Sequence, residues 1–109
     1  MTIHDSKRIL KLLIKLTESK SLKWQSQLLD SGKIKFFAQL EKFEIIIIEN
    51  KTVPDVYISS KTNIARLNLQ SGRYMNMSIQ PAEELAISLL VSVKTNCFSD
   101  LEIEFLEFF

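Results

Sequence analysis

Residues 43–49 read Phe43-Glu44-Ile45-Ile46-Ile47-Ile48-Glu49, with four consecutive isoleucines between two glutamates. Side chains alternate across a β-strand, so Ile45 and Ile47 face one way and Ile46 and Ile48 face the other way. A strand in a sheet with one wet face would alternate apolar and polar residues instead. We therefore expect this strand near the middle of a sheet that is covered on both faces, by other parts of the chain or by a second copy of it.

The segments before the isoleucines alternate apolar and polar residues, as half-buried strands do. This pattern covers Leu22–Leu29 and residues 34–40, and residues 30–33 between them contain Gly32, which can adopt the positive φ of a tight turn. We predict a hairpin that continues into the isoleucine strand as a meander. In its first strand, the side that we expect to be buried consists of Leu22, Trp24 and Leu28.

Three further segments after the isoleucines are predicted to be strands. They are Val56-Tyr57-Ile58, residues 64–69 and residues 74–79. Pro54 enforces an extended or turning backbone before the first of them, because proline has no amide hydrogen to give to a ladder. The complete sheet should therefore be an antiparallel meander of about five to six strands.

The ends of the chain have the periodicity of helices. We predict a helix from Ser6 to Glu18, capped by Asp5 or Ser6, and a second helix from Pro81 to Thr95 with its two acids in the first turn. The last residues, 99–109, fit a short third helix, because Ser99 and Glu102 have capping-box spacing. Leu101, Ile103 and Phe105 alternate with glutamates, so a strand stays open there.

Together these elements predict one α+β domain over residues 1–109, with an N-terminal helix, an antiparallel sheet and two C-terminal helices that cover the sheet. The order of Leu16-Thr17-Glu18-Ser19 and then Leu22-Lys23-Trp24 resembles the opening of small uncharacterised bacterial and phage α+β proteins. That resemblance covers the N-terminal third and implies the same architecture. It implies no activity.

The formal net charge of +1 hides an uneven distribution. Residues 1–42 hold nine Lys or Arg and four Asp or Glu, a net +5, whereas residues 43–109 hold five and nine, a net −4. This asymmetry is compatible with nucleic-acid binding. It also allows the basic first helix to lie beside the acidic last one, within one chain or across a dimer.

Several classes of protein are disfavoured by the composition. The longest wholly apolar runs have four residues, far fewer than the roughly 20 that cross a bilayer, so we expect no membrane partner. The single cysteine, Cys97, fits a reducing compartment, and we expect a cytoplasmic protein. His4 is the only histidine and no glycine-rich phosphate loop exists, so we expect no enzyme, no metal site and no cofactor.

The surplus of apolar residues favours a noncatalytic protein-interaction module, which we expect to be a homodimer and a small intracellular or phage-encoded binder or inhibitor of another protein. The residues that we expect at the interface are Leu101, Phe105, Leu106, Phe108 and Phe109. The alternative is a nucleic-acid-binding protein that uses the basic face of the first helix. Its phosphate contacts would be Lys7, Arg8, Lys11, Lys15, Lys20 and Lys23.

Overall fold

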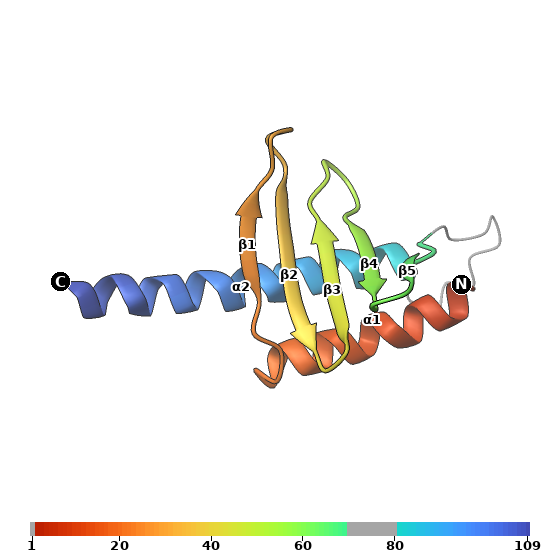
Figure 1. Ribbon diagram of the computed structural model, residues 1–109, viewed down its shortest axis with the longest axis horizontal. Helices are drawn as coiled ribbons and strands as arrows, with labels where there is room; N and C mark the ends of the chain where they lie inside the picture. The colour runs from red at the N-terminus through yellow and green to blue at the C-terminus, as the bar shows by residue number, and fades with distance from the viewer. Residues whose placement is uncertain (1, 70–80) are drawn as a thin grey trace.

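The computed structural model describes residues 2–69 and 81–109, and in them two helices flank an antiparallel sheet (Figure 1). The elements in chain order are α1 (Ile3–Glu18), β1 (Gln25–Leu28), β2 (Ile34–Leu40), β3 (Phe43–Ile48), β4 (Asp55–Ser59), β5 (Ile64–Arg66) and α2 (Ala82–Phe108). The α+β class, the N-terminal helix and the antiparallel sheet are as predicted from the sequence.

The isoleucine strand β3 lies at the centre of the sheet. The described strands are ordered β1-β2-β3-β4-β5, and each pairs antiparallel with the next. In one cross-strand row Ile46 lies between Phe37 and Tyr57, and in the next row Ile47 lies between Phe36 and Val56. Short connections between neighbouring strands favour such a meander. The strand order confirms the central position that we predicted for the isoleucines.

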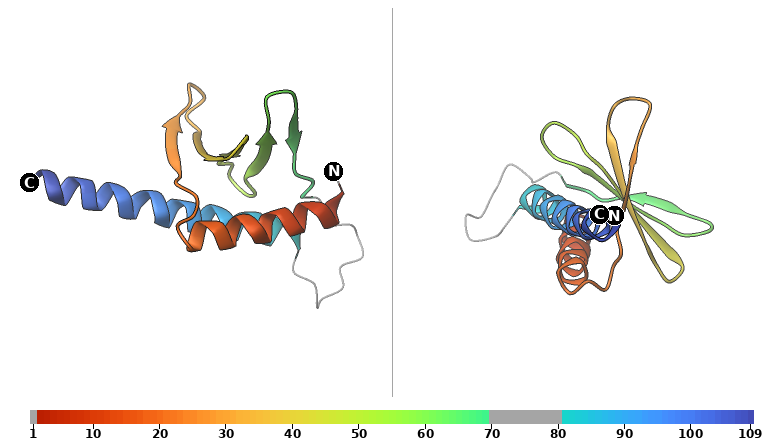
Figure 2. Two further views of the ribbon diagram at one scale, coloured as in Figure 1. Left: turned by 60° about the horizontal axis from the view of Figure 1, so that its bottom comes forward. Right: turned by 90° about the vertical axis from the view of Figure 1, so that its left-hand side faces the viewer.

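Both helices lie on the same face of the sheet and run side by side in the same direction (Figures 1 and 2). Ile45 and Ile47 point to this inner face and are buried, whereas Ile46 and Ile48 point to the outer face and are only half-buried. The hydrophobic core is formed by Leu10, Leu13, Leu22, Trp24, Phe36, Ala38, Ile45, Ile47, Val56, Leu67, Ala82, Leu85, Ala86, Leu89 and Val93. Among the described residues, no helix covers the outer face, so the predicted cover by a second copy of the chain stays a prediction there.

The predicted start of α1 is wrong by three residues, because Thr2 and not Asp5 or Ser6 is the N-cap. The Thr2 Oγ1 accepts a hydrogen bond from the Asp5 amide at 3.1 Å, as an N-cap side chain does for the third helical residue. Ser6 is buried instead. Its hydroxyl donates to the Thr2 carbonyl and accepts from the Asn68 amide at 2.9 Å, which connects α1 to the segment after β5.

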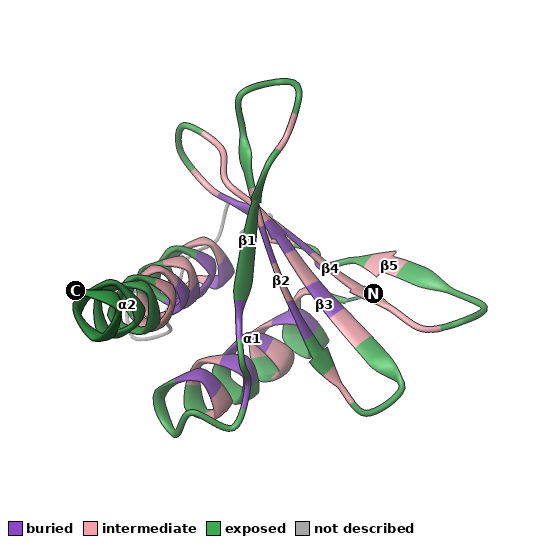
Figure 3. Cartoon of the chain, turned by 60° about the vertical axis from the view of Figure 1, so that its left-hand side comes forward, coloured by how far each residue is buried: buried purple, intermediate pink, exposed green. Residues whose placement is uncertain are grey.

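The first strand is shorter than predicted, since only Gln25–Leu28 pairs with β2. Leu22 and Trp24 are buried before the strand begins, as expected. Leu28 is not buried: its exposed fraction is 72%, because β1 is an edge strand that extends away from the helices (Figure 3).

The C-terminal part of the sheet agrees in part with the sequence prediction. The strand at residues 56–58 is present as β4, and β5 ends at Arg66, so the predicted strand over residues 64–69 is shortened. Leu67 nevertheless continues the pairing, because its amide donates to the Val56 carbonyl at 2.9 Å. The strand predicted at residues 74–79 lies outside the described residues.

The prediction of two C-terminal helices is wrong, because α2 is one continuous helix from Ala82 to Phe108. Pro81 takes the N-cap position, just before the first helical position predicted for it. Neither glycine nor proline occurs between Ala82 and Phe109, so nothing in the sequence stops the helix at Ser99. Only the first half of α2 packs on the sheet, and the second half extends past it into solvent (Figure 1).

Candidate protein-association site

The end of α2 is an unpartnered apolar surface. Every residue from Phe98 to Phe109 is exposed, and seven of these twelve are large and apolar, with exposed fractions from 53% to 86% (Figure 3). Within the described chain, Phe109 lies on Phe105 and Phe108, with ring centroids 4.8 and 5.0 Å apart. These local contacts at the end of the helix leave most of the surface of each residue in water.

The apolar residues of α2 form a stripe on its solvent side. Ile87, Val91, Phe98, Leu101 and Phe105 lie on one side of the helix because their spacings are built from steps of three and four residues. Their exposed fractions range from 42% to 61%. Between Val91 and Phe98 the position on this side of the helix is occupied by Lys94. Its ammonium forms an ion pair with Glu49, which follows β3.

The same end of α2 is acidic. Residues 98–109 contain Asp100, Glu102, Glu104 and Glu107 and no lysine or arginine, so they carry a formal charge of −4.

Cys97 lies just before this end. Burial raises the pKa of the Cys97 thiol, and the negative charge of Asp100 raises that pKa further, so the thiol stays protonated and poorly nucleophilic.

An apolar groove lies between α1 and the inner face of the sheet. Its volume is about 520 Å³, and it opens to solvent. It is lined by Ile9, Leu12, Leu13, Leu40, Phe43, Ile45, Ile58, Ser60, Asn63 and Ala65. Leu12, Phe43 and Ile58 come from α1, β3 and β4, so the groove exists only in the folded chain.

Four cationic side chains lie close to residues that line this groove, although none of them is part of the lining. Arg8 and Lys15 share a side of α1 with Leu12, four residues before it and three after it. The Lys42 ammonium lies 5.3 Å from the centroid of the Phe43 ring, and Lys61 lies in the loop that contributes Ser60 and Asn63 to the lining. The nearby acids are Asp5, which bonds Thr2, and Glu41.

The outer face of the sheet is a weaker candidate surface. Phe37, Ile46 and Tyr57 are neighbours in one row and are half-buried. Long polar side chains border them: the Lys35 ammonium lies 5.3 Å from the centroid of the Phe37 ring, and Arg66 is next to Tyr57 in the register. The aliphatic parts of such side chains shield apolar surface while their charges stay in water.

The residues predicted to contact phosphate do not all come together. Lys7, Arg8, Lys11 and Lys15 form a strip on the solvent side of α1. Lys20 lies in the turn after α1 with a positive φ of 61°, and Lys23 is exposed between two buried residues. The structure therefore groups the four helical cations and separates the other two from them.

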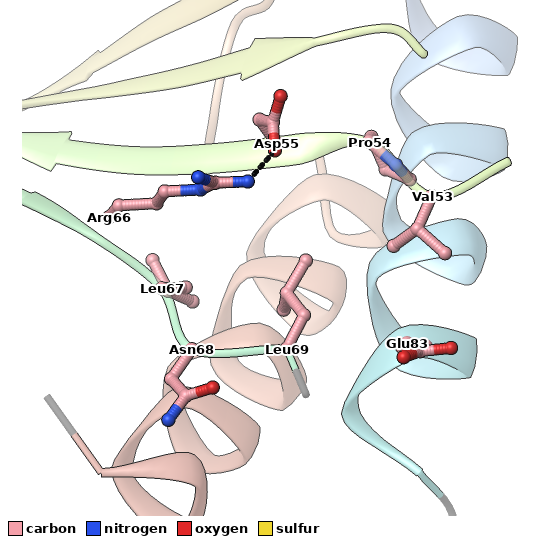
Figure 4. Close-up of a pocket in the computed structure, with 8 residues that line it drawn as sticks. All are labelled: Val53, Pro54, Asp55, Arg66, Leu67, Asn68, Leu69 and Glu83. Atoms are coloured by element: carbon pink, nitrogen blue, oxygen red, sulfur yellow. Dashed lines mark hydrogen bonds and ion pairs between the residues drawn. The ribbon is translucent and has the colours of Figure 1, made fainter. Parts of the chain in front are cut away.

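A pocket of about 360 Å³ with a mixed polar and apolar lining lies at the start of β4, near the N-terminus of α2 (Figure 4). Asp55 forms an ion pair with Arg66 there and accepts a hydrogen bond from Asn50 at 2.6 Å, so these contacts join β4 to its neighbours. Glu83 faces the pocket from α2. Sequence reasoning missed this pocket because its residues come from three distant segments.

Metal sites and membrane-spanning helices are not found in the described part of the chain. Within residues 2–69 and 81–109, no cluster of His, Cys, Asp and Glu has the composition and spacing to hold a metal ion. In the same residues, neither helix is both long and apolar enough to cross a membrane.

Comparisons with protein-family models, with curated proteins and with solved structures found no match to the chain.

Proposed function

We propose that the protein is a noncatalytic protein-interaction module that forms a homodimer through the end of α2 and binds another protein in the cytoplasm. The observation that supports it most directly is the exposure of seven large apolar side chains between Phe98 and Phe109. Contiguous apolar surface of this kind on a small protein usually marks an association site. The predicted interface residues all lie within it: Leu101, Phe105, Leu106, Phe108 and Phe109.

The energetic reason is the cost of leaving these side chains in water. Removing a large apolar side chain from water contributes about 1.5–3 kcal/mol. The described part of the chain provides no cover for residues 98–109, and a second molecule that covered them would supply this energy. A binder or inhibitor of another protein, intracellular or phage-encoded, would use the same kind of surface.

The test is the mass of the protein in solution. Sedimentation velocity at micromolar concentration should give a mass near twice the 12.6 kDa of the chain. Phe105→Ser with Phe108→Ser should weaken the dimer by about a hundredfold or more, since two aromatic side chains are lost from the interface. Ile103→Ser is the matched control, because Ile103 is also exposed but lies on the opposite side of α2 from Phe105.

Far-UV circular dichroism would verify that both variants fold, which we expect because the substituted residues are exposed. A monomeric wild-type protein would contradict the homodimer. Equal weakening by Ile103→Ser would show that general loss of hydrophobicity, and not the stripe, controls association.

A second function is favoured by one observation, the strip of Lys7, Arg8, Lys11 and Lys15 on α1. None of these cations has an ion-pair partner in the described part of the chain. Fluorescence anisotropy with a labelled DNA duplex would test nucleic-acid binding, which should weaken steeply with salt. Binding that disappears in Lys7→Glu with Lys11→Glu would favour this function over the first.

A further inference from the structure

The chain contains both an acidic apolar helix end and an apolar groove with a basic rim. We propose that, in the homodimer, the Phe98–Phe109 end of α2 from one copy lies in the groove between α1 and the sheet of the other copy. This inference rests on the proposed self-association and adds the surface that receives the helix.

The C-terminal part of the apolar stripe on α2, together with Phe108, has the spacing found in helices that bind in a groove. Phe98, Leu101, Phe105 and Phe108 follow one another at steps of three and four residues, so one side of the helix can insert all four. The groove has a volume of about 520 Å³, within the range of pockets that receive large apolar groups. Its lining is mostly aliphatic and aromatic, which suits phenylalanine and leucine side chains.

Charge complementarity identifies the occupant. The helix end carries −4, with Glu102 and Glu104 next to the stripe. The groove is bordered by Arg8, Lys15, Lys42 and Lys61, which are all exposed. Docking therefore brings carboxylates to a cationic rim while the apolar side chains leave water, and such complementarity selects partner and register.

Pairing of one α2 end with the α2 end of a second copy is less favourable. It would place two segments of −4 side by side, and like charges in a partly desolvated interface oppose association. It would also leave the groove open in both copies. Docking in the groove avoids both penalties.

The occupant has to come from a second copy. The helices α1 and α2 run in the same direction, and the end of α2 continues past the end of α1, away from the groove (Figures 1 and 2). A twofold axis lets each copy give its helix end and receive the other, which closes the assembly at two chains.

A charge-swap experiment tests the inference. One variant reverses the helix end, Glu102→Lys with Glu104→Lys, and the other reverses the rim, Arg8→Glu with Lys15→Glu. In each variant alone the charge of one surface falls to zero, the end from −4 or the rim from +4, and the reversed side chains have the same sign as the surface that they meet. The dimerisation Kd should therefore rise by about tenfold or more. In an equimolar heterodimer one interface joins the wild-type end and rim, and in the other the reversed side chains of the two variants meet with opposite signs, so the Kd should be within about threefold of the wild type.

The matched control is Lys7→Glu with Lys11→Glu. It makes the same change of charge on α1, but at positions turned away from Leu12 and the groove. At 0.15 M salt, where charges are screened over about 8 Å, its Kd should stay within about threefold of the wild type. Thermal melting of every variant would verify folding, since all of the reversed residues are exposed except Lys7, which is half-buried.

The outcomes separate the two proposals. If the wild type is a dimer and the rim variant dimerises equally well, the groove is not used, and the proposed self-association stands without it. The same conclusion follows if the mixture does not recover heterodimers. If the wild type is a monomer at micromolar concentration, the proposed homodimer and the groove docking both fail.

Discussion

Thr17 and Trp24 join α1 to the segment that enters the sheet, and replacing Thr17 by valine should destabilise the protein. The Thr17 hydroxyl accepts a hydrogen bond from the Trp24 indole N–H at 2.9 Å and donates one to the Leu13 carbonyl at 2.7 Å. Both side chains are almost completely buried, with exposed fractions of 2% and 3%. Water therefore cannot replace the hydroxyl when it is removed.

The magnitude follows from the group that is left without a partner. Valine keeps the shape of threonine, so the main loss in Thr17→Val is the acceptor for the indole N–H. A buried donor without a partner costs about 1–3 kcal/mol. The Leu13 carbonyl keeps the backbone amide of residue 17 as its helical partner. We expect a loss of about 2 kcal/mol, or about 8 °C in Tm at roughly 4 °C per kcal/mol for a chain of this size.

Urea unfolding followed by tryptophan fluorescence would measure this loss, because Trp24 is the single tryptophan. All variants should be compared at one protein concentration, since dimerisation would add to the apparent stability. Thr17→Ser keeps the hydroxyl and should lose less. The double variant Thr17→Val with Trp24→Phe removes donor and acceptor together, so its loss should be smaller than the sum of the two single losses. A Thr17→Val protein as stable as the wild type would refute the reasoning.

Three further predictions concern β3, the first hairpin and the cysteine. Ile47→Ala should cost about 3 kcal/mol in urea unfolding and Ile46→Ala less than half of that, because only Ile47 is fully buried; equal losses would contradict the difference between the faces. Gly32→Ala should cost about 1 kcal/mol through its φ of +85° alone, since no atom lies within 4 Å of the added Cβ; unchanged stability would contradict this. Alkylation of Cys97 should rise with pH only above the range of a free thiol, because its pKa is raised, and Asp100→Asn should move the rise to lower pH; a rate like that of free cysteine would contradict this.

The strands were predictable because their signals are local. Alternation and turn residues set the hairpin around Gly32, and the apolar character of both faces of β3 indicated a central strand, which the sheet order confirms. Leu28 was predicted to be buried and is exposed, because alternation identifies one side of a strand without showing how far the helices extend over it.

The helix ends were less predictable, because several residues compete for the same role. Thr2, Asp5 and Ser6 can all cap a helix, and the additional turn gained from Thr2 selects the earliest of them. Ser99 also has the type of a cap. It lies inside α2 because the preceding turn, residues 95–98, contains no glycine or proline, so continuing a helix costs less than starting a new one.

The groove could not be predicted, because its residues are adjacent only in the folded chain. Leu12, Phe43 and Ile58 lie far apart in the sequence, and their approach depends on the sheet register and on the position of α1. The stripe on α2, in contrast, has a signal in the sequence that the prediction of two separate helices did not use. Ile87 and Val91 continue the spacing of Phe98 and Leu101, so the regular steps of one long helix run through Ser99 without a break.

More apolar surface is exposed on α2 than on the isoleucine strand. Ile46 and Ile48 are half-buried although no described helix covers them. Ile46 lies between Phe37 and Tyr57 in the sheet, and Ile48 lies between Lys35 and Asp55. Both helices contribute to the inner core, so within the described residues the outer face is covered by neighbouring strand side chains and not by a helix. The end of α2 has no such cover, since Phe108 and Phe109 expose 82% and 86% of their surfaces. The end of α2 is therefore the surface that gains most from a partner, and we propose that the groove of a second copy covers it.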